Sequence, residues 1–278
     1  MPLPTTKIGD VTVARLACGS NSFFGFSHLS AARDTWLKRH FTDERLYGMF
    51  ECCARLGINL FVSGNQERFA RLRRELEDAT GHHINWACTP SGRTLDELKA
   101  GIDQCRSWDV EICLPHTSFI EQNLDLRNGE ITDLREALGY IRSLGMVPGV
   151  STHRPEAVPL CVDKGYDAET FILPLNALGF LCQVEIEWQE RIIRNCPKPL
   201  IVIKPLAAGR LTPVPGFTFV YQRIKTIDAV AVGVMAPEEL EEDVSLVCGL
   251  LGEPVQEIAL TTSRSKAHLR SVVTGGSG

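Results

Sequence analysis

The chain has 278 residues, 44% of them hydrophobic, and a formal net charge of −5. This length and composition suit one domain with a sizeable buried core. The basic residues are scattered among acidic ones, which argues against nucleic acid as a partner, and no apolar run approaches the roughly 18 residues that span a membrane. The start of the chain also lacks the pattern of a signal peptide. We therefore expect a cytoplasmic protein, with neither nucleic acid nor membrane as a partner, and leave open whether it forms a homo-oligomer.

The ten cysteines include no Cys-x-x-Cys pair. Several of them, such as Cys18, Cys88 and Cys113, fall inside apolar runs, where a thiol behaves as a small apolar group. We expect reduced cysteines in the core, as is usual inside cells.

The first predicted element is a hairpin around Ile8-Gly9-Asp10-Val11, where a turn-forming pair joins two short strands. We expect this hairpin to close the floor of the domain. Eight apolar runs follow at intervals of about thirty residues, a rhythm typical of a (β/α)8 or TIM barrel. The predicted strands are Ala14 to Ser20, Asn59 to Ser63, Ile84 to Thr89, Val110 to His116, Val147 to His153, Thr170 to Asn176, Leu200 to Lys204 and Ala229 to Gly233.

Helical segments alternate with these strands. The first is preceded by a long loop, Asn21 to Phe41, rich in aromatic residues and typical of a lid. The predicted helices are Asp43 to Leu56, Gln66 to Ala79, Thr94 to Ser107, Asp133 to Leu144, Pro155 to Lys164, Glu185 to Asn195, Pro237 to Leu251 and an extra one at Val255 to Leu269. We predict one barrel domain over residues 1–274, followed by a flexible tail over 275–278.

Polar residues end several of the predicted strands. His116, His153, Asn176 and Lys204 each close an apolar run. The loops after the strands of a TIM barrel form one rim, where such enzymes carry their active sites. These four side chains should therefore meet at one mouth of the barrel.

Several short segments, in the same order as these strands, carry a resemblance to a known family. They are Ile8 to Leu16 with Gly19 and Ser20, Leu56 to Phe61, Gly149 to Ser151, Pro205 to Gly209, and Val232-Gly233 with Pro237 to Glu242. Together they resemble the aldo-keto reductases across nearly the whole barrel. The resemblance implies a (β/α)8 barrel with an N-terminal β-hairpin, a small carbonyl or sugar-like substrate, and NADPH as the cofactor.

The catalytic groups of that family are an aspartate and a tyrosine after strand two, a lysine after strand three and a histidine after strand four. Only the histidine has a counterpart here, His116 in Leu114-Pro115-His116. The segment Ser63 to Phe69 carries neither the aspartate nor the tyrosine that would protonate a carbonyl oxygen. No lysine follows Cys88-Thr89-Pro90-Ser91. The resemblance thus implies a divergent member with His116 as its catalytic residue.

Lys204 and His153 are the other candidate catalytic residues. A lysine that ends an apolar strand could bind an anion, stabilise an oxyanion or form a Schiff base. His153 could act as acid or base because its ordinary pKa lies near neutrality. His28, from the long first loop, could join His116 and His153 in holding a divalent metal ion, although no close spacing of ligands supports this.

The loops after the seventh and eighth strands often hold a phosphate in such barrels. Small residues, an arginine and a helix start occur there in this chain. The usual lysine-serine and arginine pattern for the adenosine phosphate of NADPH is not visible after Gly233. The predicted cofactor contacts are Ser20, Asn21, Asn176, Ala207, Gly209, Arg210, Gly233 and Met235.

Three functions remain open from the sequence. The first is a divergent oxidoreductase of the aldo-keto reductase type, acting on a small carbonyl or sugar-like substrate with NADPH. The second is a redox-neutral lyase, isomerase or epimerase that uses His116, His153 and Lys204, with or without a divalent metal. The third is a barrel that binds a small ligand without catalysis.

Overall fold

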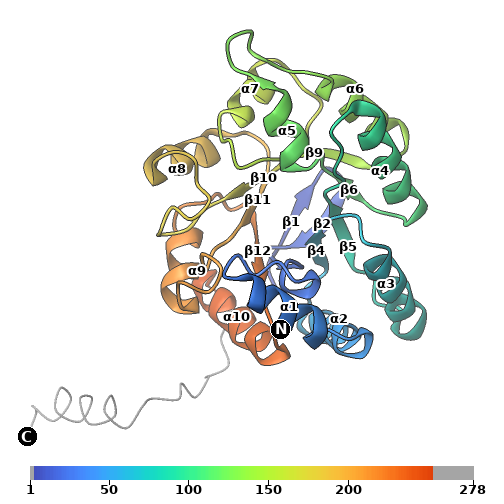
Figure 1. Ribbon diagram of the computed structural model, residues 1–278. Helices are drawn as coiled ribbons and strands as arrows, with labels where there is room; N and C mark the ends of the chain where they lie inside the picture. Colours follow the sequence, from blue (N-terminus) through green and yellow to red (C-terminus); the bar gives the residue numbers. More distant parts are fainter. Residues whose placement is uncertain (1–2, 253–278) are drawn as a thin grey trace, which may run out of the picture.

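The computed structural model describes residues 3–252, which form a closed barrel of eight parallel strands surrounded by helices (Figure 1). Around the barrel the order is β10-β11-β12-β3-β4-β5-β6-β9, so each strand pairs with the next barrel strand along the chain. The strands are β3 (Leu16–Gly19), β4 (Leu60–Ser63), β5 (Asn85–Cys88), β6 (Ile112–Cys113), β9 (Val147–Ser151), β10 (Thr170–Pro174), β11 (Leu200–Ile203) and β12 (Ala229–Gly233). The predicted TIM barrel is confirmed.

The N-terminal hairpin consists of β1 (Thr5–Ile8) and β2 (Val11–Ala14), paired in antiparallel fashion. Ile8 and Val13 are fully buried and pack against the inward side chains of the barrel strands, among them Leu60 and Ile112. Figure 1 shows the two strands within the ring of barrel strands. The hairpin therefore fills the interior at the amino ends of the strands, as the sequence predicts.

A second, larger core lies between the barrel and the helices around it, and includes Phe50, Phe61, Phe69 and Trp86. The helices are α1 (Ala31–His40), α2 (Asp43–Leu56), α3 (Glu67–Thr80), α4 (Leu95–Ser107), α5 (Thr117–Asn123), α6 (Leu134–Ser143), α7 (Ala157–Asp163), α8 (Ile186–Asn195), α9 (Pro213–Tyr221) and α10 (Pro237–Leu250). Each predicted helix up to Leu251 has a counterpart in this series.

The long first loop is more structured than the sequence analysis expects. It contains a short 3-10 helix, η1 (Ser22–Phe24), and the helix α1. Ser30 caps α1 by accepting a hydrogen bond from the backbone N–H of Arg33, and basic residues fill its last turn, both of which favour a helix. The prediction of a lid or binding loop rests on the length of the segment, and these helix signals shorten the irregular part of it.

Two further helices, α5 and α9, and a small hairpin are also additions to the prediction. The hairpin pairs β7 (Leu124–Asp125) with β8 (Glu130–Ile131). The predicted helix at Val255 to Leu269 and the predicted tail at 275–278 lie outside the described residues. Over residues 3–252, none of the helices has both the length and the apolar character needed to cross a bilayer.

Candidate functional site at the mouth of the barrel

Lys204 follows β11 directly, and its side chain meets His28, which comes from the first loop. The Lys204 Nζ and the His28 Nε2 are 2.7 Å apart. Asn21 Nδ2 lies 3.1 Å from the same ring nitrogen. An ammonium group and an amide NH2 can only donate, so His28 Nε2 is the acceptor and its ring is neutral with the proton on Nδ1. The pair thus joins a cation directly to a base.

Burial shapes the acid–base behaviour of this pair. It lowers the pKa of Lys204 to about 8. The pKa of His28 is also lowered, first by burial and then by the charge of Lys204. Among residues 3–252, Lys204 forms no ion pair with a carboxylate. A partly buried amine without a counter-ion is unusual, and this arrangement is typical of functional lysines.

The backbone at both residues adopts a conformation that non-glycine residues rarely occupy. The φ angle is 64° at Lys204 and 56° at His28, both in the left-handed region. Such a conformation costs on the order of 1–3 kcal/mol and persists where the surrounding structure enforces it, often at functional sites. The fold therefore holds both members of the pair in place at some expense of stability.

His153 lies beside this pair and is held by Glu121 of α5. The Glu121 Oε1 accepts a hydrogen bond of 2.8 Å from the His153 backbone N–H and one of 2.7 Å from the Thr117 hydroxyl. The same oxygen is 3.8 Å from His153 Nδ1. Burial lowers the pKa of His153, the carboxylate of Glu121 raises it, and the charge of Lys204 lowers it. Glu121 is thus the acid that fixes this histidine at the mouth.

His116 forms the N-cap of α5 with its imidazole ring. Its Nδ1 accepts a hydrogen bond of 3.2 Å from the Ser118 backbone N–H and lies 2.9 Å from the Ser118 hydroxyl. Because Nδ1 accepts from that N–H, the neutral ring carries its proton on Nε2. Burial lowers the pKa of His116, and the charge of His153 lowers it further. His116, His153, His28 and Lys204 therefore interact as one group.

Asn176 supports the site through its own loop. It is fully buried, its Oδ1 accepts from the backbone N–H groups of Leu178 and Phe180, and its Nδ2 donates to the Phe180 carbonyl. The Phe180 ring then packs edge-on against His28, with centroids 6.0 Å apart, and lies 4.4 Å from the Arg210 guanidinium carbon. A contact from Asn176 to a cofactor stays a prediction, and its visible role is to place Phe180.

The loop after β11 offers few groups to a phosphate. The φ angles at Ala207, Ala208 and Gly209 are 48°, 56° and 81°. The N–H groups of Ala207 and Gly209 donate to the carbonyls of Lys204 and Leu206 within the loop. Arg210 donates to the carbonyls of Ala207 and His28. The Ala207 and Gly209 N–H groups are therefore already hydrogen-bonded within the loop, and the Arg210 guanidinium contacts the His28 backbone.

The loop after β12 is occupied by a carboxylate. Glu239 accepts a hydrogen bond of 2.7 Å from the Met235 backbone N–H, and Glu238 and Glu239 are both in the first turn of α10. These carboxylates take the place of an anion at the helix N-terminus. Gly233 is exposed in open space, and the Ser20 hydroxyl donates to the Val62 carbonyl. The Met235 N–H and the Ser20 hydroxyl are thus engaged within the fold, and the cofactor contacts stay predictions.

The structure does not support the hypothesis of a metal site. Within residues 3–252, there is no group of three or more histidine, cysteine or acidic side chains placed to hold a metal ion. The His28 Nε2 faces the Lys204 amine instead of the other two histidines. A cation beside a would-be ligand repels a metal ion, which is the physical reason for the correction.

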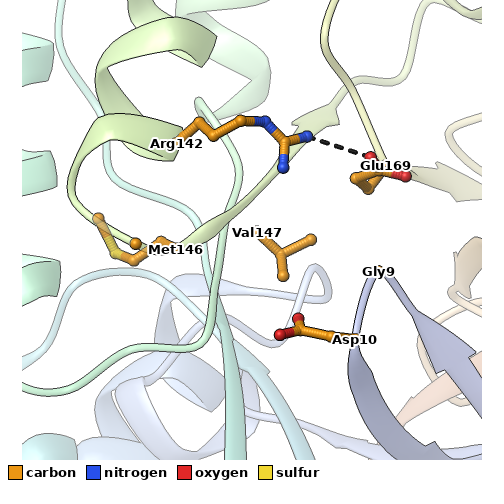
Figure 2. Close-up of a pocket in the computed structure, with 7 residues that line it drawn as sticks. Gly9, Asp10, Arg142, Met146, Val147 and Glu169 are labelled. Carbon is orange, nitrogen blue, oxygen red and sulfur yellow. Dashed lines mark hydrogen bonds and ion pairs between the residues drawn. The ribbon is translucent and has the colours of Figure 1, made fainter.

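A separate cavity of about 360 Å³ lies at the opposite end of the barrel (Figure 2). It is formed by the turn of the N-terminal hairpin, the start of β9 and the neighbouring residues Arg142 and Glu169, which hydrogen-bond each other at 3.1 Å. None of the predicted site residues lines it. The catalytic candidates belong to the mouth, at the carboxyl ends of the strands.

Sequence reasoning missed Glu121 and Phe180 as parts of the site. Glu121 lies five positions after His116, on a helix that the sequence analysis did not predict. Phe180 lies four positions after Asn176, in the loop that this asparagine closes. Both residues follow a strand-end residue by four or five positions, and this short spacing is the sequence signal that could have identified them.

No family model matches the sequence, and no curated protein matches it. Solved structures do match. An aldo-keto reductase from Bacillus halodurans in its holo form has a TM-score of 0.62 at 12% identity, covering 98% of this chain and 96% of that one. An aldo-keto reductase from Klebsiella pneumoniae in complex with NADPH has a TM-score of 0.53 at 12% identity, covering 98% and 95%.

A glycerol dehydrogenase from Gluconobacter oxydans is also similar, with a TM-score of 0.52 at 14% identity, covering 93% of this chain and 98% of that one. Identities this low establish the fold and leave the chemistry to the residues of the site. The resemblance inferred from the hairpin and the strand entries is thereby confirmed at the level of the fold. This chain has the fold of the aldo-keto reductases.

Proposed function

We propose that the protein is an enzyme that transforms small carbonyl or sugar-like compounds at the mouth of the barrel without net oxidation or reduction. The observation that carries this proposal is the contact of 2.7 Å between the Lys204 amine and the neutral His28 ring. A partly buried lysine paired with a base, rather than with a carboxylate, is suited to attack a carbonyl carbon. The class of reaction is that of a lyase, an isomerase or an epimerase.

The chemistry begins when the Lys204 ammonium gives up its proton to solvent, with His28 as the relay, a loss that a pKa of about 8 favours near neutral pH. The free amine adds to the carbonyl carbon, a carbon–nitrogen bond forms, and the carbonyl oxygen leaves as water to give an imine. The imine nitrogen takes up a proton from solvent and withdraws electrons from the neighbouring carbon, which then releases a proton or breaks a carbon–carbon bond, the second fragment leaving as a carbonyl compound. After that carbon takes up a proton again, water hydrolyses the imine, which releases the product and restores the Lys204 amine. His153 and His116, with pKa values lowered by burial, are the groups available to carry protons there.

Borohydride trapping tests this proposal directly. A panel of small aldehydes, ketones and ketoses is incubated with the protein and reduced, and the modified peptide is identified by mass spectrometry. The expected adduct is on Lys204, with a yield that rises as pH increases through about 8, since only the neutral amine adds to the carbonyl.

Lys99 is the internal control, because its amine is paired with Glu136 at 2.6 Å. Equal labelling of Lys204 and Lys99 across the panel would remove the proposal. Labelling of neither residue by any compound would do the same.

A second candidate is NADPH-dependent carbonyl reduction, which the fold favours, since the similar structures include complexes with NADPH and with NADP. Fluorescence titration of the protein with NADPH, compared with NADH, tests it. Because Glu239 occupies the Met235 N–H at the start of α10, we expect no binding at millimolar nucleotide.

The variant Glu239→Gln separates the carboxylate from the remaining geometry of the loop. Micromolar NADPH binding by the unmodified protein would favour reduction over the imine route. Binding that appears only in Glu239→Gln would identify this carboxylate as the obstacle.

A further inference from the structure

Two neighbouring cations at the mouth of the barrel, Lys204 and Arg210, have no carboxylate partner within residues 3–252. Lys204 and Arg210 both converge on His28, the first on its ring at 2.7 Å and the second on its carbonyl at 3.1 Å. Over the described residues neither forms an ion pair with a carboxylate. By contrast, Arg73, Lys99 and Arg142 each reach a carboxylate within 3.2 Å.

The acids near the mouth are already engaged. Asp34 accepts hydrogen bonds from the backbone N–H and the hydroxyl of Ser27. Glu121 accepts from Thr117 and from the His153 backbone. Neither carboxylate pairs with the two cations, so the positive charge at the mouth is uncompensated within the fold. Such charge favours entry of an anion and strengthens its binding.

The donors that remain free also favour an anion. Arg210 has five N–H donors, and within residues 3–252 its hydrogen bonds go to two carbonyls, those of Ala207 and His28. Its guanidinium is stacked 4.4 Å from the Phe180 ring centroid, which fixes its plane and leaves its remaining edge available. A guanidinium held in this way is suited to bind a planar carboxylate or a phosphate through two parallel hydrogen bonds.

From this arrangement we infer that the carbonyl substrate carries an anionic oxygen group, a carboxylate or a phosphate, which binds Arg210 beside Lys204. The inference rests on the proposed function for the reacting carbonyl, and the anion site itself can be tested without that reaction. The shared contact of both cations with His28 places the anion-binding and carbonyl-binding groups around one residue, which suits an anionic group close to the carbonyl.

The test uses inert anions as probes. Acetate and inorganic phosphate are titrated in parallel into the full-length protein at constant ionic strength, and the His28 ring signals are followed by NMR. We expect a saturable shift for at least one anion, with a dissociation constant raised at least tenfold in Arg210→Gln and partly restored in Arg210→Lys. Tighter binding of acetate would identify a carboxylate, and tighter binding of phosphate would identify a phosphorylated substrate.

Arg45→Gln is the matched control, because Arg45 also contacts a histidine, His40, at 2.9 Å, but on the α1–α2 surface. It should leave the titration unchanged. The inference is overturned if neither anion binds, or if Arg210→Gln binds as well as the unmodified protein. If the inference is overturned but borohydride still traps a neutral ketone at Lys204, the proposed function stands. If an anion binds but no carbonyl compound is trapped, the result counts against the proposed function alone.

Discussion

The variant Lys204→Met should lose all carbonyl trapping and at the same time become more stable. Removing the amine removes the only group that the proposed chemistry uses to attack the carbonyl. The folded pKa of about 8 lies below the ordinary value near 10.4, so the folded state holds the ammonium at a cost of about 3 kcal/mol at pH 7. Loss of the hydrogen bond to His28 offsets about 1 kcal/mol of that. A net gain of about 2 kcal/mol in unfolding free energy is expected.

The dependence of this gain on pH identifies its origin. Between pH 8 and about 10.4 the unfolded chain binds one more proton at Lys204 than the folded protein, so the stability of the unmodified protein rises with pH there. The gain from Lys204→Met should therefore shrink across that window in urea unfolding experiments. Lys99→Met, which breaks the exposed pair with Glu136, should change stability by less than about 1 kcal/mol. A destabilised Lys204→Met would show that the ammonium is well satisfied in the fold and would undermine its assignment as a functional group.

The variant Asp243→Asn should stabilise the protein by about 2–4 kcal/mol at pH 7. Asp243 is 2% exposed on α10, and its Oδ2 has no hydrogen-bond partner. Burial raises the pKa of this carboxyl to about 8, and the charges of Glu239 and Glu242 raise it as well. The folded state therefore keeps the acid neutral at pH 7, while the unfolded chain ionises it and gains hydration. The amide of asparagine removes that advantage of the unfolded chain.

The sign of the pH dependence is opposite to that of Lys204. From about pH 4 to pH 8 the folded state binds one more proton at Asp243 than the unfolded chain, so this residue makes stability fall as pH rises. Urea unfolding at several pH values should show that contribution disappear in Asp243→Asn. Glu238→Gln, at an exposed position of the same helix, serves as the control and should change stability by under about 1 kcal/mol. An Asp243→Asn variant that is no more stable at pH 7 would mean that the carboxyl stays ionised in the fold.

The barrel was predictable because its signal is local and repeated. Each strand is a short apolar run such as Leu200–Ile203, and the run ends where the strand ends. The position of the catalytic candidates at one mouth follows from the same pattern, since strand-end residues share a rim. The hairpin was predictable from one turn-forming pair, Gly9-Asp10, between two short strands.

The contacts within the site were not predictable, because they join distant parts of the chain. His28 and Lys204 are 176 positions apart, and no spacing rule links them. The fixing of His153 by Glu121 depends on α5, a helix of seven residues whose cap is an unusual one, the ring of His116. Asp243 was hidden for another reason. It ends the segment Glu238 to Asp243, in which every residue except Leu240 is acidic, and such a segment suggests a helix face in water.

The hairpin and the residue that follows it also contact the segment just before the last barrel strand, β12. Thr6 donates a hydrogen bond to the carbonyl of Ile227, and Arg15 donates to the carbonyls of Asp228 and Lys225. These partners are synthesised more than two hundred residues after the hairpin, as the separation of 221 positions between Thr6 and Ile227 shows. Contacts of such length slow folding, because the chain must close a large loop before it gains them. Ile8 and Val13 also gain their packing partners gradually, since these range from Leu60 to Ala231 along the chain. During synthesis the emerging N-terminal segment therefore exposes apolar side chains that can aggregate before the later barrel strands are made.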